Sequence, residues 1–164
     1  MTRSPSGWDI DSPVQAEVFV VSDRDGRLEL TGPCGAAPWL LELGASDHPV
    51  AVVDRIVRDV VGQPLLVHST SWRRDRDAVI LTFLVVIDGG SVGSMPSEPI
   101  ERAELARSEA TSAPRDIAMT QVVEHALRHL AWLASDDRVV ASVLSDRWRA
   151  LLATYPVEPF RALG

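Results

Sequence analysis

A single amphipathic helix that lies between two predicted β-hairpins is the feature that most constrains the fold of this chain. Within residues 50–61 the apolar side chains recur at helical spacing and form one stripe: Val53, Ile56, Val57 and Val60. Asp47 is the expected N-cap of this helix, Gly62 suits its end, and Pro64 cannot continue it. Because hairpins on both sides of one helix do not build a regular βαβ repeat, the sequence predicts an α/β fold with a mixed sheet and helices packed on it.

The segments around this helix have the composition of β-strands, with many β-branched and large apolar residues. The expected strands cover residues 14–21, 27–31 and 39–43 before the helix, and 65–72 and 78–87 after it. Gly26 suits the turn of the first hairpin because glycine accepts a positive φ, and the charged residues 73–77 form the turn of the second. Residues 88–99 contain three glycines and two prolines and are expected to form a loop.

The C-terminal part of the chain is predicted to be helical. The expected helices cover residues 100–107, about 114–134 and about 138–154, so that a helical part spans about 114–154. Residues 1–13 are polar, contain two prolines and are expected to form a flexible arm. The length of the chain allows a single domain over residues 14–164.

The overall charge and the cysteine count exclude several kinds of partner and setting. The 164 residues carry a formal net charge of −7, so neither nucleic acid nor an anionic membrane is an expected partner. Cys34 is the only cysteine, which excludes an intrachain disulfide and fits a reducing compartment. The first eight residues lack the apolar region of a secretion signal, and the longest apolar runs, such as 80–87, are too short to cross a bilayer. We therefore expect a soluble, cytoplasmic protein.

The segment from Val18 to Gly62 resembles the first half of a Nudix hydrolase domain. It contains a strand, an Asp-x-Asp-Gly-Arg turn at residues 23–27, a second strand, Trp39 and one helix that ends on glycine. The Nudix box has the pattern G-x5-E-x7-R-E-U-x-E-E-x-G-U, where U is aliphatic. Aligning its last glycine with Gly62 gives a comparison without gaps, and the resemblance implies a mixed sheet flanked by helices.

In this alignment the positions that agree with the box are Arg55, Val57 and Gly62. Two box glutamates are replaced by the shorter Asp47 and Asp59, and two others by the apolar Ile56 and Val60. The first glycine and the last aliphatic residue of the box are also missing, because Leu41 and Gln63 stand in their places.

The resemblance implies Mg²⁺ or Mn²⁺ bound between helix carboxylates and a substrate diphosphate, where the metal neutralises phosphate charge and activates water. Asp59 is the one acidic residue left in the helix group, and a lone carboxylate is a poor Mg²⁺ site. We therefore expect a Nudix-like domain that has lost metal-dependent pyrophosphohydrolase activity and binds a ligand or a partner. Arg55 and Asp59 are four residues apart and are expected to form an ion pair on the helix surface.

Two alternatives remain open at this stage. The chain can be a divergent hydrolase of a nucleoside diphosphate linked to another moiety, with Asp47, Asp59 and Glu109 as catalytic carboxylates. It can also be a homo-oligomeric scaffold, for example a homodimer formed through the C-terminal helices. Mg²⁺ or Mn²⁺ is an expected cofactor under the hydrolase alternative alone.

Other residue types indicate possible contacts with a nucleotide-like small molecule. Trp39 and Trp72 lie at strand ends, where an indole can stack on a base. Arg55 and Arg107 are the expected phosphate contacts. His125 and His129 are four residues apart on a predicted helix, a spacing that places two imidazoles on one face and can serve a metal ion.

Overall fold

The computed structural model of the chain describes residues 12–105 and 117–157, and the flexible arm expected over residues 1–13 lies almost wholly outside them. The elements follow in the order β1 (Val14–Arg24), β2 (Arg27–Thr31), β3 (Trp39–Leu43), α1 (Pro49–Val60), β4 (Pro64–Asp75), β5 (Ala78–Ile87), the 3₁₀ turn η1 (Gly89–Ser91), β6 (Ser97–Pro99), α2 (Met119–Asp136), α3 (Arg138–Val143) and α4 (Asp146–Leu152). The predicted mixed α/β sheet with additional C-terminal helices is confirmed.

The sheet is organised around β1. Its strands are ordered β4-β5-β1-β2-β6, and β3 pairs with β1 on the same side as β2. The first half of β1 pairs with β3 and the second half with β2, while β5 runs parallel to β1 along most of its length. The other pairs are antiparallel, so the sheet is mixed.

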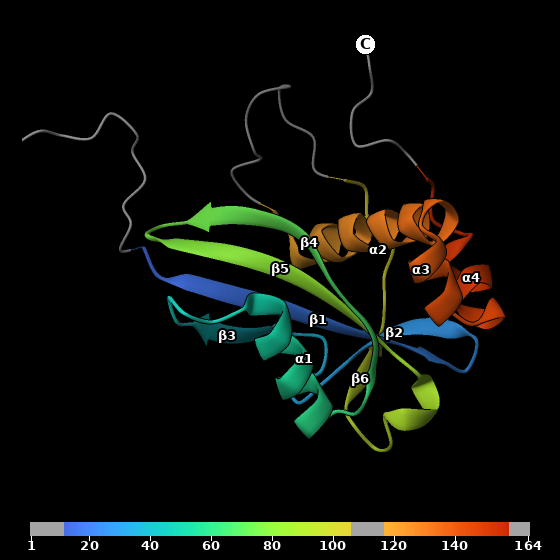
Figure 1. Cartoon of the computed structure of the whole chain (residues 1–164). Coiled ribbons are helices and arrows are strands. Elements are labelled where there is room, and N and C mark those ends of the chain that lie inside the picture. The colour runs from blue at the N-terminus through green and yellow to red at the C-terminus, as the bar shows by residue number, and fades with distance from the viewer. Residues whose placement is uncertain (1–11, 106–116, 158–164) are drawn as a thin grey trace, which may run out of the picture.

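Helices cover both faces of this sheet, as Figure 1 shows, with α1 on one side and α2, α3 and α4 on the other. On the α1 side, Val53 and Val57 are fully buried against alternate residues of β1 and β5. On the α2 side, Leu127 and Trp148 are fully buried among the residues of these strands that point the opposite way. Because strand side chains alternate between faces, the two central strands serve two separate hydrophobic cores.

The turn between β1 and β2 explains why β1 runs three residues further than predicted. Asp25 and Gly26 have φ values of 49° and 78°, so both adopt the left-handed conformation of a type I′ hairpin turn. Such a tight turn lets the polar residues Ser22–Arg24 pair directly with β2. The second hairpin turns at Arg76, whose φ is 52°, and β4 likewise continues into the expected turn.

Several boundaries differ from the predictions. His48, not Asp47, is the N-cap of α1, because the Asp47 carboxylate accepts a hydrogen bond from the backbone N–H of Gly44 instead. The expected loop 88–99 contains β6, which pairs with β2. Residues 100–105 are not helical, and α2 begins at Met119.

The expected helix over 138–154 is two shorter helices. Leu144 adopts an extended conformation between α3 and α4, and the Ser145 hydroxyl accepts a hydrogen bond from the backbone N–H of Trp148 to cap the second helix. In the described residues, no helix is long and apolar enough to cross a membrane.

Candidate functional site

The outer surface of α1 carries the two charged residues that the family resemblance singles out. Arg55 and Asp59 are both exposed, as expected for the polar side of an amphipathic helix. The ion pair on this helix joins Arg58 to Asp54, with Nη2 and Oδ2 2.8 Å apart, and the expected pair of Arg55 with Asp59 is not formed. Asp59 is therefore an exposed carboxylate near the end of the helix.

Asp47, the second acidic candidate, lies just before the opposite end of α1. The helix rises about 1.5 Å per residue, so about 15 Å of helix separate Pro49 from Asp59. Asp47 and Asp59 consequently do not converge on one position. Arg107 and Glu109, the remaining phosphate and catalytic candidates, lie outside the described residues.

Apolar side chains occupy the box positions that would supply the missing carboxylates. Ile56 is half-buried, and Val60 is 48% exposed in the last turn of α1. Within residues 12–105 and 117–157, no group of three or more His, Cys, Asp or Glu side chains is arranged to hold a metal ion.

The two tryptophan candidates lie on different parts of the sheet. Trp39 is half-buried on β3 and packs against the core under α1, whereas Trp72 is 58% exposed on β4. Two strands, β1 and β5, separate β3 from β4. The cavity beside Trp39 has a volume of about 10 Å³, roughly the space of one water molecule. The indoles therefore do not form the two walls of one base-binding slot.

The histidine candidates, in contrast, lie in a cluster. His125 and His129 are half-buried on one side of α2, and His129 contacts His68 of β4. The His68 Nε2 and His129 Nδ1 atoms are 3.1 Å apart. Trp132 stacks on the His129 ring, with centroids 5.7 Å apart and planes inclined by 13°.

Burial sets the charge state of this cluster. It lowers the pKa of His129, and it lowers the pKa of His68 and of His125 with a smaller contribution from repulsion by His129. Arg128 also lowers the pKa of His125. The imidazoles are thus kept in the neutral form, which can accept a hydrogen bond or ligate a metal.

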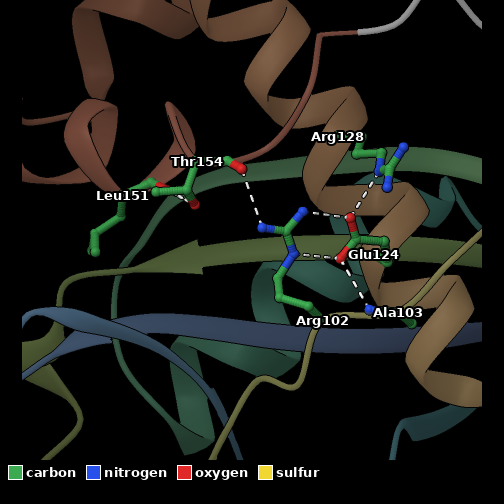
Figure 2. A network of polar contacts seen from close by, with 6 residues as sticks. All are labelled: Arg102, Ala103, Glu124, Arg128, Leu151 and Thr154. Atoms are coloured by element: carbon green, nitrogen blue, oxygen red, sulfur yellow. Dashed lines mark hydrogen bonds and ion pairs between the residues drawn. The ribbon is translucent and has the colours of Figure 1, made fainter.

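A second cluster lies on α2 around the fully buried Glu124, and Figure 2 shows its contacts. Both carboxylate oxygens accept hydrogen bonds from Arg102, each of 2.9 Å, and one also accepts a hydrogen bond of 2.7 Å from Arg128. Arg102 donates a further hydrogen bond to the carbonyl of Thr154 and lies over the Tyr155 ring, 4.1 Å from its centroid.

These contacts fix the pKa of Glu124 and the position of the chain after β6. Burial alone would raise the pKa of Glu124, but the hydrogen bonds from Arg102 and Arg128 outweigh burial and lower it. Glu124 therefore stays ionised and connects α2 to Arg102 and, through it, to the end of the chain after α4. The cluster is satisfied internally, which indicates a structural role.

A third polar cluster spans three strands on the α2 side of the sheet. Arg73 of β4 donates two hydrogen bonds of 2.7 Å to the carboxylate of Glu17 on β1, and the Thr82 hydroxyl of β5 donates a third of 3.1 Å. The hydrogen bond that Arg73 donates to Glu17 is the largest cause of a raised pKa for Arg73. The bidentate geometry satisfies both charges within the sheet.

An open hollow of about 400 Å³ lies between α2 and α4. Small apolar residues form most of its wall, with two polar side chains at the side: Ala131, Ala134, Ser135, Arg149, Leu152, Ala153, Tyr155 and Val157. The guanidinium of Arg149 already donates to the carbonyls of Ala141 and Leu144. The volume is in the range of small-molecule sites.

The sequence pattern identified part of the histidine cluster and missed the rest. The four-residue spacing of His125 and His129 was visible on a predicted helix, whereas His68 lies 61 residues from His129 in an expected strand. No pattern within a short stretch of sequence indicates that a strand residue contacts a helix residue 61 positions later. The role of Glu124 was missed for the same reason, since Arg102 is 22 residues away.

Comparison with known proteins assigns no family to the chain. No protein-family model matches its sequence, and no curated protein is significantly similar to it.

Proposed function

We propose that this chain is a Nudix-like domain that binds a ligand or a partner and does not hydrolyse diphosphates with Mg²⁺ or Mn²⁺. The observation that supports the proposal is the surface of α1, where Asp59 is exposed and lies a helix length from Asp47. Asp59 therefore offers a divalent ion a single carboxylate, which is a poor Mg²⁺ site.

The chemistry of the absent carboxylates explains why such a surface would not catalyse the reaction. Mg²⁺ is held by one or two carboxylates together with substrate phosphates, in a strict octahedral geometry. Ile56 and Val60 offer no oxygen at the positions where the Nudix box carries glutamates. The substrate's negative charge would then be left without the metal that neutralises it.

The direct test is phosphate release from a panel of nucleoside diphosphate derivatives in the presence of Mg²⁺ or Mn²⁺. We expect turnover below about 1 s⁻¹, the lower end of typical enzyme values, and no difference between the unaltered chain and Asp59→Ala. Metal-dependent turnover above that value, lost in Asp59→Ala, would instead establish the divergent hydrolase with Asp47, Asp59 and Glu109 as candidate carboxylates. Asp54→Ala is a matched control because Asp54 lies on the same helix in an ion pair.

The ligand that we propose is a nucleotide-like small molecule. The open hollow between α2 and α4 has a volume that suits such a ligand. We expect Ala134→Trp, which would fill part of this hollow, to weaken any ligand found by thermal-shift screening by about tenfold or more, the equivalent of about 1.4 kcal/mol. Unchanged affinity would place the ligand elsewhere.

The partner that we propose is a second copy of this chain, in a homodimer formed through the C-terminal helices. Val139 is 73% exposed on α3, and Trp132 and Val143 are also exposed. A dimer that used this surface would dissociate in Val139→Glu, because a charge buried without a partner is costly. Sedimentation equilibrium that finds a monomer at tens of micromolar would remove the dimer from consideration.

A further inference from the structure

The hydrogen bond between His68 and His129 brings two imidazole nitrogens close to the separation that two ligands of one metal ion have. Their nearest nitrogen atoms, Nε2 of His68 and Nδ1 of His129, are 3.1 Å apart, and the ring centroids are 4.8 Å apart. Zinc binds imidazole nitrogen at 2.0–2.1 Å with tetrahedral angles, which places two ligand nitrogens about 3.3 Å apart. The two nitrogens would have to separate by about 0.2 Å to reach this spacing, with both lone pairs turned toward the ion.

Both rings are held in place by the fold. His68 lies within β4, the strand at one end of the sheet, and His129 lies near the middle of the long helix α2. Trp132 stacks on His129 from the same helix. A pair of ligands fixed by two rigid elements loses little conformational freedom when it binds an ion, which favours binding.

The surroundings also supply the neutral form that metals require. Burial lowers the pKa of His68 and of His129, so each ring keeps a lone pair at neutral pH. His125 lies one turn before His129 on α2 and is likewise half-buried. In the part of the chain that the structure describes, however, no three such side chains converge on one point, so two protein ligands would hold the ion.

We propose that His68 and His129 form a binding site for a divalent transition metal ion of the zinc class, with water completing the coordination. Imidazole ligands suit Zn²⁺, Ni²⁺ and Cu²⁺, whereas Mg²⁺ and Mn²⁺ prefer oxygen. The site lies on α2 and β4 and uses no residue of the α1 surface. A negative result for this site therefore does not bear on the proposed function, and the reverse also holds. Two open positions on the ion would remain available to water or to an anionic ligand.

The competing explanation is a direct hydrogen bond between two neutral imidazoles, with one ring donating and the other accepting. Such a pair would stabilise the packing of α2 on β4 and would bind no metal. The two explanations differ in whether the imidazole nitrogens bind a metal ion, which calorimetry and spectroscopy measure directly.

The test is calorimetric titration of Zn²⁺ into the full chain, prepared without a polyhistidine tag, at pH 7.5. We expect saturable binding of one ion per chain, and a loss of affinity of about 10- to 100-fold or more in His68→Gln and in His129→Gln. His48→Gln is the matched control, because His48 caps α1 on the other side of the sheet and its loss should leave the affinity unchanged.

A spectroscopic readout separates metal ligation from a packing role. Electron paramagnetic resonance of the Cu²⁺-loaded chain should show hyperfine coupling to two imidazole nitrogens, and His68→Gln should reduce this to one. Circular dichroism verifies that each variant is folded before titration. The proposal is overturned if Zn²⁺ uptake does not saturate near one ion per chain, or if folded His68→Gln and His129→Gln bind Zn²⁺ as tightly as the unaltered chain.

Discussion

At the scale of single residues, the buried carboxylates of Glu17 and Glu124 each bind an arginine from a distant part of the sequence. Glu17 binds Arg73 across the sheet, and Glu124 binds Arg102 and Arg128. A buried carboxylate of this kind is costly unless every oxygen is satisfied, and both oxygens of Glu124 accept hydrogen bonds. Removing the carboxylate would take one hydrogen-bond acceptor away from each of Arg102 and Arg128.

We therefore predict that Glu124→Gln lowers the free energy of unfolding by about 3 kcal/mol, the lower end of the range for breaking a buried ion pair. The lower end applies because the Arg102 side chain is 47% exposed and regains water. Urea unfolding measures the change. Asp54→Asn is the control, since it breaks a surface pair with Arg58 and should cost about 0.5 kcal/mol or less. Equal losses in the two variants would show that the Glu124 cluster is no more stabilising than a surface pair.

The same carboxylate makes stability depend on pH in acid. Its pKa in the folded chain lies below the ordinary glutamate value of 4.5, so the unfolded chain takes up a proton first as pH falls. The stabilisation by Glu124 is therefore complete above about pH 4.5 and is lost as pH falls through the folded pKa. Glu29 adds to the effect, because the hydrogen bond from Ser97 lowers its pKa against the effect of burial.

We predict that the free energy of unfolding of the unaltered chain decreases between pH 5 and pH 3. The free energy of unfolding of Glu124→Gln should decrease less over this interval. Urea unfolding at a series of pH values gives both curves. Parallel curves for the two chains would show that Glu124 does not titrate differently in the folded and unfolded states.

At the scale of elements, local signals predicted most helices and strands, and long-range pairing accounts for one of the errors. The apolar stripe of α1 and the two hairpins were visible because their residues are neighbours in sequence. Strand β6 was missed because it is three residues long, ends in Pro99 and exists through its pairing with β2 about 68 residues earlier. The break at Leu144 was missed because the helical period continues across it.

The junction between β5 and the following turn depends on a glycine. A Cβ atom added to Gly89 would lie 2.1 Å from the carbonyl oxygen of Asp23, and the Gly89 N–H donates a 2.9 Å hydrogen bond to the Asp23 carboxylate. The backbone of η1 therefore approaches the end of β1 more closely than any side chain allows.

We predict that Gly89→Ala destabilises the fold by about 1–3 kcal/mol, as expected for overpacking against backbone. Gly32→Ala is the matched control, because a Cβ atom there would meet nothing within 4 Å. Thermal unfolding followed by circular dichroism compares the two variants. If Gly89→Ala and Gly32→Ala melt at the same temperature, the close approach of η1 to β1 is not tight in solution.

At the scale of the whole molecule, one mixed sheet separates two surfaces with different chemistry. The α1 side carries the exposed Asp59, and the α2 side carries the histidine and Glu124 clusters. The sequence predicted the mixed sheet with helices packed on it, and it predicted that Asp59 is on the polar side of α1 and that His125 and His129 lie one turn apart on a helix. It could not predict His68 or Arg102 as partners, because those contacts depend on how α2 crosses the sheet.

We propose that the α1 surface does not hold the divalent ion that Nudix-type hydrolysis requires. Calorimetric titration of Mn²⁺ measures this property, because Mn²⁺ prefers carboxylate and so avoids the histidine pair. We predict no saturable uptake by the unaltered chain beyond that of Asp59→Asn. Tight binding of Mn²⁺ that disappears in Asp59→Asn would contradict the account and restore a metal-dependent enzyme.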